Sequence, residues 1–480
     1  MIQKKKLFTT QNSVIFFILL CAFAVRLYKI TTPPLDWHSF RQADTASVTR
    51  NYVTNGIDLL HPTYHDLSNI ASGKENPQGY RMVEFPLLNA VSAAVVLLFN
   101  LPSVDVVSRL VSVVLSIGTL LFLFLLTKKI SGKRVALITL IIGSFFPYFV
   151  FYSRTILPEA GVVFFSTGAL YFFYSWCAQK KWWQYFLSAV FLALGLLLKP
   201  FVLFLFPVFF AIWFSHKRAL SSFFLTLFLL GGAVTPLLWW RNWIQNYPEG
   251  IPASNWLFNG NGIRLRPAWF RWLFYERMTK LMLGFVGSIF LPISLFKLKK
   301  SELYIYGAWW FGMLSYLAII ATGNVQHDYY QNLLVPILLI TVARGACMTE
   351  VFLRKKFTPA VSLSIVSLLV ISSLATSWWY VKEYYIVNHW EYVRAGAAVD
   401  KLTPLNSKVI APAFGDTQFL YQTKRSGWAM GYSIDEKIKL GATHYVTTSK
   451  DDEANELKKR FTILEETSEF VLIDLTQPKK

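Results

Sequence analysis

Long apolar stretches constrain this chain more than any other feature. About 20 consecutive apolar residues are enough to cross the ~30 Å hydrocarbon core of a bilayer. About eleven such stretches occur before residue 380, at 13–30, 104–127, 135–152, 159–178, 183–198, 201–215, 221–240, 281–296, 302–321, 329–347 and 358–377. The chain is 54% hydrophobic and 15% charged, whereas soluble domains carry about 25% charged residues. This excludes a cytosolic globular enzyme, a disordered chain and a fibrous protein, and we expect an all-α multi-span membrane protein.

The positions of lysine and arginine predict the direction of the spans. Cytoplasmic loops carry an excess of these residues. With the N-terminus inside, five basic loops face the cytoplasm, at 128–134, 180–181, 216–218, 297–300 and 354–356. The basic residues 4–6 precede the first span, and no cleavage site follows it, so we expect a retained anchor with a cytoplasmic N-terminus. The loop at 241–280 would be external and yet carries several arginines, so either the topology is wrong there or this basic loop has a function.

This topology requires that the apolar stretch 86–100 does not cross the membrane. The stretch is short and lies between Pro86 and Pro102. We therefore expect a helix at the outer surface, within one long external loop over 31–103. Residues 1–382 then form a multi-span membrane domain.

The composition changes after about residue 378. Residues 383–480 are mixed and charged, with short apolar runs at 408–411, 444–447 and 470–473 that predict buried strands. Helices are expected at 387–402 and 451–460. An odd number of spans places this small C-terminal α/β domain outside the cell.

Several short polar clusters lie at the predicted outer ends of the spans, where ionisable residues are candidates for function. They contain Asp36, His38, Arg41, Gln42, Asp44, Glu84, Arg154, Glu159, Lys199, His327, Tyr330 and Gln331. The external histidines lack the spacing of a metal site, so we assign no metal ligands.

Each cluster also has a purely structural interpretation. Asp36 could cap the helix that is expected near residue 40, and Asp44 could be solvated or pair with Arg41. Arg154 and Lys199 could reach lipid headgroups. Five such clusters on one side argue against a structural explanation of all of them.

The clusters resemble a known family. The run 134–200, with Tyr152-Ser153-Arg154 before an acidic residue and Leu198-Lys199-Pro200 at its end, is similar to the core of bacterial protein O-mannosyltransferases and lipid A aminoarabinose transferases. Residues 36–42, 84–87 and 327–331 resemble the same branch. The chain thus resembles lipid-linked glycosyltransferases of the GT-C fold. The family commonly begins a helix with an Asp-Glu pair, which is missing here, and either Asp36 or Asp44 could replace it.

The resemblance implies inverting transfer of a sugar from a polyprenyl-phosphate donor to an acceptor hydroxyl on the outer membrane face. A carboxylate would act as general base, with Asp36 first and Asp44 and Glu159 as the other candidates. Arg41, Arg154 and Lys199 would offset the charge that develops on the leaving phosphate. The remaining residues of the clusters are expected to bind donor or acceptor: His38, Gln42, Glu84, His327, Tyr330 and Gln331.

On this interpretation no cofactor is required, and the use of a divalent metal stays open. The acceptor is a glycan, a lipid or a protein, and no nucleic acid is expected as a partner. A multi-span lipid or solute transporter or flippase is the alternative. Transporters usually contain repeated halves and midplane sites, whereas this sequence shows no repeat and its polar clusters lie at one surface.

Overall fold

The computed structural model describes residues 10–216 and 219–479. The basic residues predicted to be cytoplasmic at 4–6 and 217–218 lie outside these ranges. The chain forms two compact units. The first, which we call the helical unit, contains Met1–Ile30, Ser112–Trp240 and Ser254–Glu383; the second, the mixed unit, contains Thr31–Val111, Arg241–Ala253 and Tyr384–Lys480.

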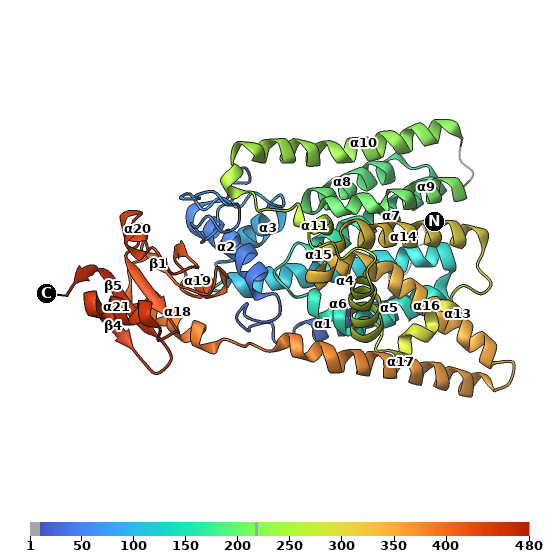
Figure 1. Ribbon diagram of the computed structural model, residues 1–480. Helices are drawn as coiled ribbons and strands as arrows, with labels where there is room; N and C mark the ends of the chain where they lie inside the picture. Colours follow the sequence, from blue (N-terminus) through green and yellow to red (C-terminus); the bar gives the residue numbers. More distant parts are fainter. Residues whose placement is uncertain (1–9, 217–218, 480) are drawn as a thin grey trace. The chain divides into compact units, whose positions relative to one another are not determined.

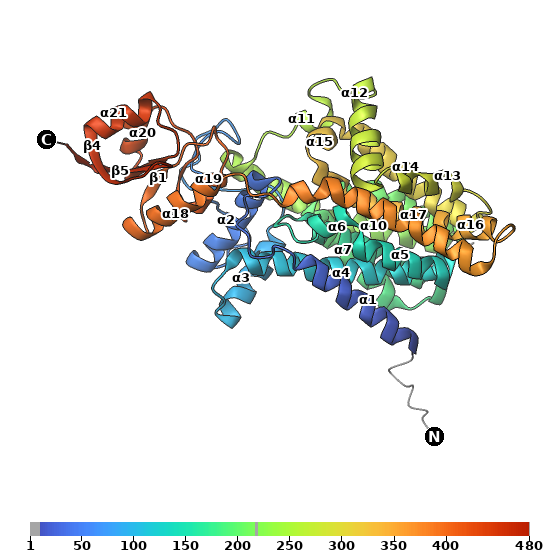
Figure 2. The ribbon, with the colours of Figure 1, turned by 90° about the horizontal axis from the view of Figure 1, so that it is seen from below.

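Apolar helices, most of them long, make up most of the helical unit, and several of them run alongside one another (Figures 1 and 2). They are α1 (Thr10–Arg26), α4 (Val104–Ser131), α5 (Lys133–Phe145), α6 (Pro147–Tyr152), α7 (Glu159–Gln179), α8 (Trp182–Leu198), α9 (Phe206–Ser215), α10 (Leu220–Trp243), α14 (Lys300–Ile319), α16 (Val335–Leu353) and α17 (Pro359–Val381). Most begin and end within a few residues of the predicted spans.

Five helices within the described ranges are long and apolar enough to cross a membrane. They include α4, α7 and α17, and four shorter apolar helices accompany them. The chain is therefore a multi-pass membrane protein.

Short and irregular helices connect the long ones. They are η1 (Pro200–Leu205), α11 (Trp256–Asn259), α12 (Pro267–Phe270), the π-helix η4 (Arg271–Met282), η5 (Val286–Ile289), α13 (Phe290–Ile293), α15 (Ala321–Gln326) and η6 (Asp328–Leu334).

The prediction of one continuous span over 281–296 is wrong. Gly284 and Phe285 have positive φ angles of 52° and 57°, which end the helical path. A Cβ atom on Gly284 would lie 2.2 Å from the carbonyl oxygen of Ser373 in α17. The close approach of this turn to α17 therefore requires glycine, and the turn breaks the predicted helix into η4, η5 and α13.

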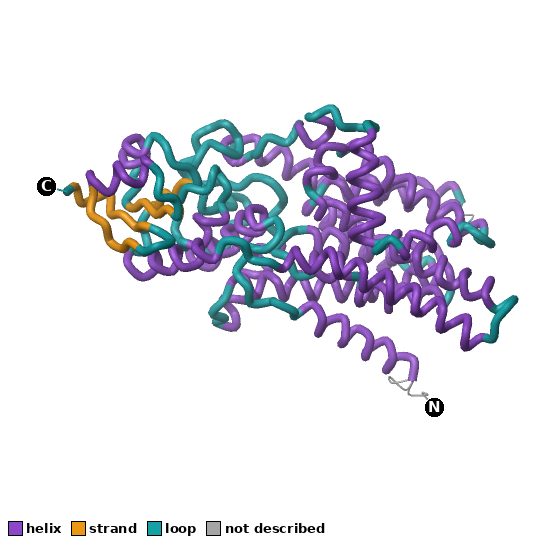
Figure 3. Tube along the Cα trace, turned by 60° about the horizontal axis from the view of Figure 1, so that its bottom comes forward, coloured by secondary structure: helices purple, strands orange, loops and turns teal. Residues whose placement is uncertain are grey.

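The mixed unit contains short helices and all the strands that the structure describes (Figure 3). Its helices are α2 (Ser39–Asn55), α3 (Leu87–Phe99), η2 (Ile244–Asn246), η3 (Pro248–Gly250), α18 (Trp390–Leu402), α19 (Gln418–Gln422), α20 (Ile434–Lys439) and α21 (Asp452–Arg460), and η7 (Lys382–Tyr385) lies where the two units join in the sequence. Helix α3 has 13 residues, fewer than the ~20 that a span needs. This length agrees with the prediction that the stretch 86–100 does not cross the membrane.

The sheet has five strands in the order β2-β1-β3-β5-β4. They are β1 (Lys408–Ile410), β2 (Ser426–Trp428), β3 (His444–Thr447), β4 (Phe461–Glu466) and β5 (Val471–Pro478). Strands β2, β1 and β3 are parallel, and β5 is antiparallel to both of its neighbours. Helices α18 and α19 supply core residues to one face, and α20 and α21 to the other.

The three predicted strands and both predicted helices are confirmed. The sequence did not predict β2, which has only three residues, or β4, whose side chains are mostly half-buried.

The external loop also contributes to this sheet. The amide of Leu67 donates to the carbonyl oxygen of Gly427 at 2.7 Å, and the amide of Gly427 donates to that of His65 at 2.9 Å. Residues 65–67 thus extend the sheet beside β2. A Cβ atom on Gly427 would lie 1.8 Å from the carbonyl oxygen of Val409, so this position requires glycine. Part of the loop 31–103 therefore folds together with residues 384–480.

Candidate functional site

A buried ion pair joins two turns of the helical unit. Glu159 is the first residue of α7, and Lys199 lies between the end of α8 and Pro200, in extended backbone with φ −153°. The Nζ atom of Lys199 donates to Oε1 of Glu159. Only 6% of Lys199 and 4% of Glu159 is exposed. Because water is largely excluded, this pair interacts more strongly than a surface pair.

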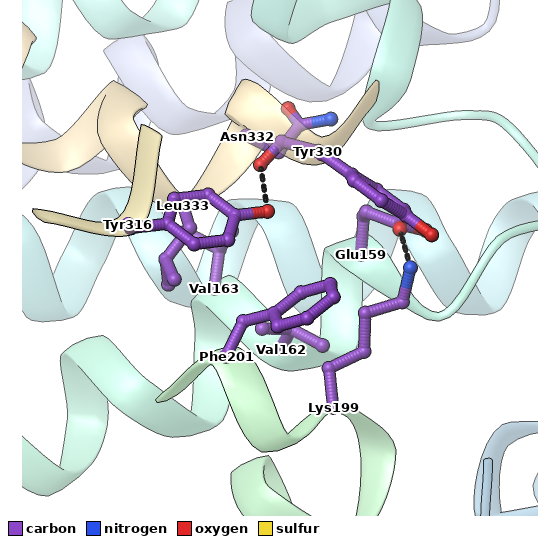
Figure 4. A pocket seen from close by; sticks show the side chains of 9 residues that line it. All are labelled: Glu159, Val162, Val163, Lys199, Phe201, Tyr316, Tyr330, Asn332 and Leu333. Carbon is purple, nitrogen blue, oxygen red and sulfur yellow. Dashed lines mark hydrogen bonds and ion pairs between the residues drawn. The ribbon is translucent and has the colours of Figure 1, made fainter. Parts of the chain in front are cut away.

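Aromatic rings surround the Lys199 ammonium. Its Nζ lies 4.3 Å from the ring centre of Tyr330, 5.1 Å from that of Tyr329 and 5.9 Å from that of Phe201. A desolvated cation is stabilised by the faces of such rings. The ammonium group of Lys199 thus lies beside a carboxylate and three aromatic side chains, of which Figure 4 shows Tyr330 and Phe201.

A small cavity opens beside this ion pair (Figure 4). Its lining is mostly apolar and consists of Glu159, Val162, Val163, Lys199, Phe201, Tyr316, Tyr330, Asn332 and Leu333. The second carboxylate oxygen of Glu159, Oε2, is buried and has no hydrogen-bond partner among the described residues. A buried acceptor without a partner is costly, so Oε2 is suited to receive a hydrogen bond from a ligand or a water molecule.

Asp328 is another buried carboxylate of the helical unit, and none of its surface is exposed. The hydroxyl of Tyr152 donates to its Oδ1 at 2.6 Å, and Nη1 of Arg277 lies 3.4 Å from its Oδ2. Arg277 is on the π-helix η4. Such helices are rare and occur frequently at functional sites. Arg277 thus belongs to the basic loop 241–280, which is unexpected on the outer side, and pairs with Asp328 in the predicted polar segment 327–331.

Three further predicted residues have defined places in the helical unit. Arg154 is fully buried and donates to the carbonyl oxygen of Lys29 at 3.0 Å. The ring of His327 stacks on Tyr329 with 5.2 Å between ring centres. Gln331 is buried, and its Nε2 donates to the carbonyl oxygen of Asn324 at 2.7 Å.

Asp36 lies in the mixed unit, and its side chain is fully buried. Its Oδ1 accepts from Nε2 of Gln42 at 2.6 Å, and Nη2 of Arg109 lies 3.5 Å from both of its oxygens. The interpretation of Asp36 as a helix cap is wrong, because α2 is preceded directly by His38 in a left-handed conformation and has no side-chain cap.

Arg41 and Glu84 form an ion pair in the same unit. Nη2 of Arg41 donates to both oxygens of Glu84, at 2.6 and 2.5 Å. The two residues are far apart in the sequence, and both belong to predicted polar clusters. The half-buried ring of His38 makes an edge contact with Trp37, with 5.2 Å between ring centres.

Asp44 is neither solvated nor paired with Arg41, so both structural interpretations of this residue are corrected. It is 7% exposed, and its Oδ2 lies 2.7 Å from Nη2 of Arg81. Its Oδ1 accepts from the hydroxyl of Thr417 at 2.7 Å. Asp44 therefore joins α2 to the loop that follows β1.

One family model matches the chain. It describes dolichyl-phosphate-mannose-protein mannosyltransferases and matches residues 84–240. These residues include Glu84, Arg154, Glu159 and Lys199. A search of curated protein sequences finds no match.

Solved structures match almost the whole chain. ArnT from Cupriavidus metallidurans bound to undecaprenyl phosphate has a TM-score of 0.68 at 11% identity, covering 97% of this chain and 98% of that one. The chain has the GT-C fold. The oligosaccharyltransferase of Archaeoglobus fulgidus in the apo form has a TM-score of 0.58 at 13% identity, covering 92% and 70%. The same organism's AglB with an inhibitory peptide and a dolichol-phosphate has a TM-score of 0.58 at 12% identity, covering 96% and 74%.

Within this GT-C fold, each unit brings together some of the predicted clusters. In the helical unit the turns that carry Glu159, Lys199 and Tyr330 meet. In the mixed unit Arg41 meets Glu84. Among the described residues, no group of three or more His, Cys, Asp or Glu side chains could hold a metal ion.

Sequence reasoning did not single out Asp328, which pairs with Arg277 of the basic loop 241–280. It also missed two cations that pair with predicted carboxylates, Arg109 beside Asp36 and Arg81 beside Asp44. For Arg109 a signal was present, because it lies inside an apolar stretch where charged residues are rare and often functional. Arg81 had no such signal, because it lies in a polar loop.

Proposed function

We propose that this chain is an integral-membrane inverting glycosyltransferase. It transfers a sugar from a polyprenyl-phosphate donor to an acceptor hydroxyl of a glycan, lipid or protein at the outer membrane face. The observation that carries the proposal is the buried Lys199–Glu159 pair beside a mostly apolar cavity. It lies within the region that matches a family of lipid-phosphate-dependent mannosyltransferases.

In this proposal Lys199 and Arg277 bind the donor phosphate. Lys199 lies beside Glu159, and Arg277 lies beside Asp328. Because a phosphate can carry more negative charge than a single carboxylate, both cations can still attract it. As the bond between the anomeric carbon and the phosphate oxygen breaks, its electron pair stays on the phosphate. Fixed cations stabilise that developing charge without reorganisation.

A carboxylate accepts the proton of the acceptor hydroxyl while the hydroxyl oxygen attacks the anomeric carbon from the face opposite the phosphate. Asp36 is the base that we propose first. Glu159 is the second candidate, because its Oε2 has no partner among the described residues. Both oxygens of Asp36 lie near Arg109, so Asp36 would need to exchange this contact for the substrate.

The proposed orientation places the N-terminus in the cytoplasm and residues 384–480 outside the cell. It is supported by the basic loops at 128–134, 297–300 and 354–356. The outer face is also where a lipid-linked donor is available and nucleotide sugars are generally absent.

The test compares two donors with the purified full-length chain. Radiolabelled polyprenyl-phosphate sugar and the matching nucleotide sugar are each incubated with the protein and an envelope fraction of the cells that make it. We expect incorporation from the lipid-linked donor and none from the nucleotide. Direct, metal-dependent incorporation from the nucleotide sugar would overturn the proposal.

A further inference from the structure

Two aromatic side chains of the mixed unit are exposed to an unusual extent. Phe414 is 95% exposed and Tyr432 is 72% exposed. Phe414 lies in the loop 411–417 after β1, and Tyr432 lies in the loop 429–433 after β2. Because β1 and β2 are parallel neighbours, both loops lie at the carboxyl edge of the sheet. We call these two loops the aromatic edge.

Backbone hydrogen bonds fix both rings in their outward positions. The amides of Ala413 and Gly415, on either side of Phe414, both donate to the carbonyl oxygen of Ala429 at 3.0 Å. Phe414 is therefore the apex of a tight loop, with φ 54°. The amide of Tyr432 donates to Oε2 of Glu453 at 2.7 Å, and its φ is 63°. This left-handed backbone conformation is uncommon for residues other than glycine.

The aromatic edge lies where α/β sheets usually bind ligands. The chain passes from β1 to its neighbour β2 and then crosses to β3 on the other side of β1. In open α/β sheets, ligands bind outside the carboxyl ends of the strands at such a change of direction. The change of direction occurs at β1, and the loop 411–417 follows this strand.

The charges around the aromatic edge favour an uncharged ligand. Asp416 lies in the same loop as Phe414, and burial raises its pKa to about 6. Glu453 binds the other loop, while the nearby Lys437 is engaged with the carbonyl oxygen of Gly431 at 2.9 Å. Exposed aromatic rings with carboxylates are unsuited to phosphates or acidic polymers. They suit sugars, whose hydroxyls donate to carboxylates and whose rings have an apolar face.

We propose that the aromatic edge binds the glycan of the acceptor, as an uncharged hydroxyl-rich chain that stacks on Phe414 and Tyr432. This inference rests on the proposed function, because the bound glycan is the one that receives the sugar. A phospholipid surface is the less suitable occupant, since binding to an anionic bilayer relies on clustered lysine and arginine and this edge carries carboxylates.

The first test measures transfer and donor hydrolysis side by side in the full-length chain. The double variant Phe414→Ala/Tyr432→Ala should keep its hydrolysis of polyprenyl-phosphate sugar to water. Its transfer to the envelope fraction should fall by about tenfold or more, as is usual when aromatic anchors are removed. Leu405→Ala is the matched control, because Leu405 is 85% exposed and precedes β1, at the opposite edge of the sheet. Unchanged transfer in the double variant would overturn the inference, as would an equal loss of hydrolysis.

The second test does not depend on any transfer reaction. Radiolabelled uncharged oligosaccharides released from the same envelope are dialysed to equilibrium against the full-length chain. We expect saturable binding that the Leu405→Ala variant keeps and the double variant loses. Saccharide binding without any transfer by the wild-type chain would refute the proposed function and leave the aromatic edge as a sugar site. Absence of oligosaccharide binding, or ring-dependent binding to phosphatidylglycerol vesicles instead, refutes the inference itself.

Discussion

The buried carboxylates Glu159 and Asp328 lie beside Lys199 and Arg277, so removing either cation has two separate consequences. It deletes a proposed phosphate ligand, and it leaves a carboxylate buried without its counter-charge. The second effect alone costs about 3–5 kcal/mol of folding free energy in typical buried pairs. A loss of activity in a single variant therefore does not by itself identify a phosphate site.

A double variant separates the two effects at Lys199. Lys199→Met should lower both the thermal stability and the use of polyprenyl-phosphate donor. Lys199→Met/Glu159→Gln removes the uncompensated charge as well, so we expect stability to recover while donor use stays low. Thermal unfolding in detergent and donor turnover are measured on the same samples, with the exposed Lys355→Met as control. Recovery of donor use in the double variant would show that Lys199 only neutralises Glu159.

The π-helix η4 offers a matched pair of arginines. Arg277 is 14% exposed and lies beside Asp328, whereas the side chain of Arg271 on the same helix is 73% exposed. Arg277→Gln should reduce donor turnover by roughly tenfold or more, as expected for loss of a charged transition-state contact. Arg271→Gln should leave turnover nearly unchanged. Equal effects of the two substitutions would assign Arg277 a structural role.

Neutralising each candidate base should distinguish Asp36 from Glu159. Asp36→Asn retains the side-chain shape and should reduce sugar transfer by roughly 10²–10⁴-fold, the usual contribution of a general base. Folding is checked by thermal unfolding of the same preparation. Near-normal transfer in Asp36→Asn, together with a large loss in Glu159→Gln, would move the base to Glu159.

At the scale of elements, the backbone pairing of residues 65–67 with Gly427 makes the external loop and the C-terminal residues fold as one. Arg50 on α2 adds to this packing, because its guanidinium lies 3.8 Å from the ring centre of Tyr421 and its Nη1 donates to the Tyr421 carbonyl oxygen at 2.8 Å. A chain that ends at residue 383 loses all of these partners. It should become sensitive to limited proteolysis between residues 56 and 82. Resistance of that segment in the truncated chain would show that the loop folds alone.

Asp66 lies in the segment 65–67 that pairs with Gly427, and its titration makes the stability of this sheet edge depend on pH. Burial raises the pKa of Asp66 from 3.8 to about 6, so the folded state favours the protonated form. The stabilising contribution is full below pH 3.8 and is lost as the pH rises through about 6. The wild type should gain about 2 kcal/mol over Asp66→Asn between pH 7 and pH 4.

The measurement is hydrogen exchange of the Leu67 and Gly427 amides, which pair across this edge. Comparing the wild type with Asp66→Asn at each pH cancels the intrinsic pH dependence of exchange. It also cancels the opposite contribution of His65, whose pKa burial lowers. A difference between the two proteins that is constant with pH would contradict the assignment.

The sequence predicted elements that have a strong apolar pattern and failed where contacts between distant segments decide the structure. The long helices and the strands β1, β3 and β5 follow directly from apolar runs. The break at Gly284 depends on how closely the turn approaches α17, and the short strand β2 depends on its neighbours on both sides. Carboxylates such as Asp36 and Glu159 were recognised by type and position. Asp328 was not singled out, and its partner Arg277 comes from a distant π-helix.

At the scale of the whole molecule, the proposed topology places residues 384–480 and the loop at 354–356 on opposite sides of the membrane. In a Cys21→Ser background, Leu405→Cys and Lys355→Cys place single reactive thiols at exposed positions. The native Cys21 is partly buried, and Cys177 and Cys347 are buried. A membrane-impermeant maleimide should label Leu405→Cys in intact cells and Lys355→Cys only after permeabilisation. Labelling in the reverse order would invert the topology.

The central claim is that the chain breaks the bond between a sugar and a lipid phosphate rather than moving the intact lipid. The most direct measurement uses a donor with ³²P in its phosphate and ¹⁴C in its sugar, in vesicles that contain the purified chain and an acceptor fraction. We predict one molecule of sugar-free polyprenyl phosphate released for each sugar transferred, with both products lost in Lys199→Met. Movement of the doubly labelled lipid across the bilayer with its sugar still attached, and no release of polyprenyl phosphate, would contradict the account and favour a flippase.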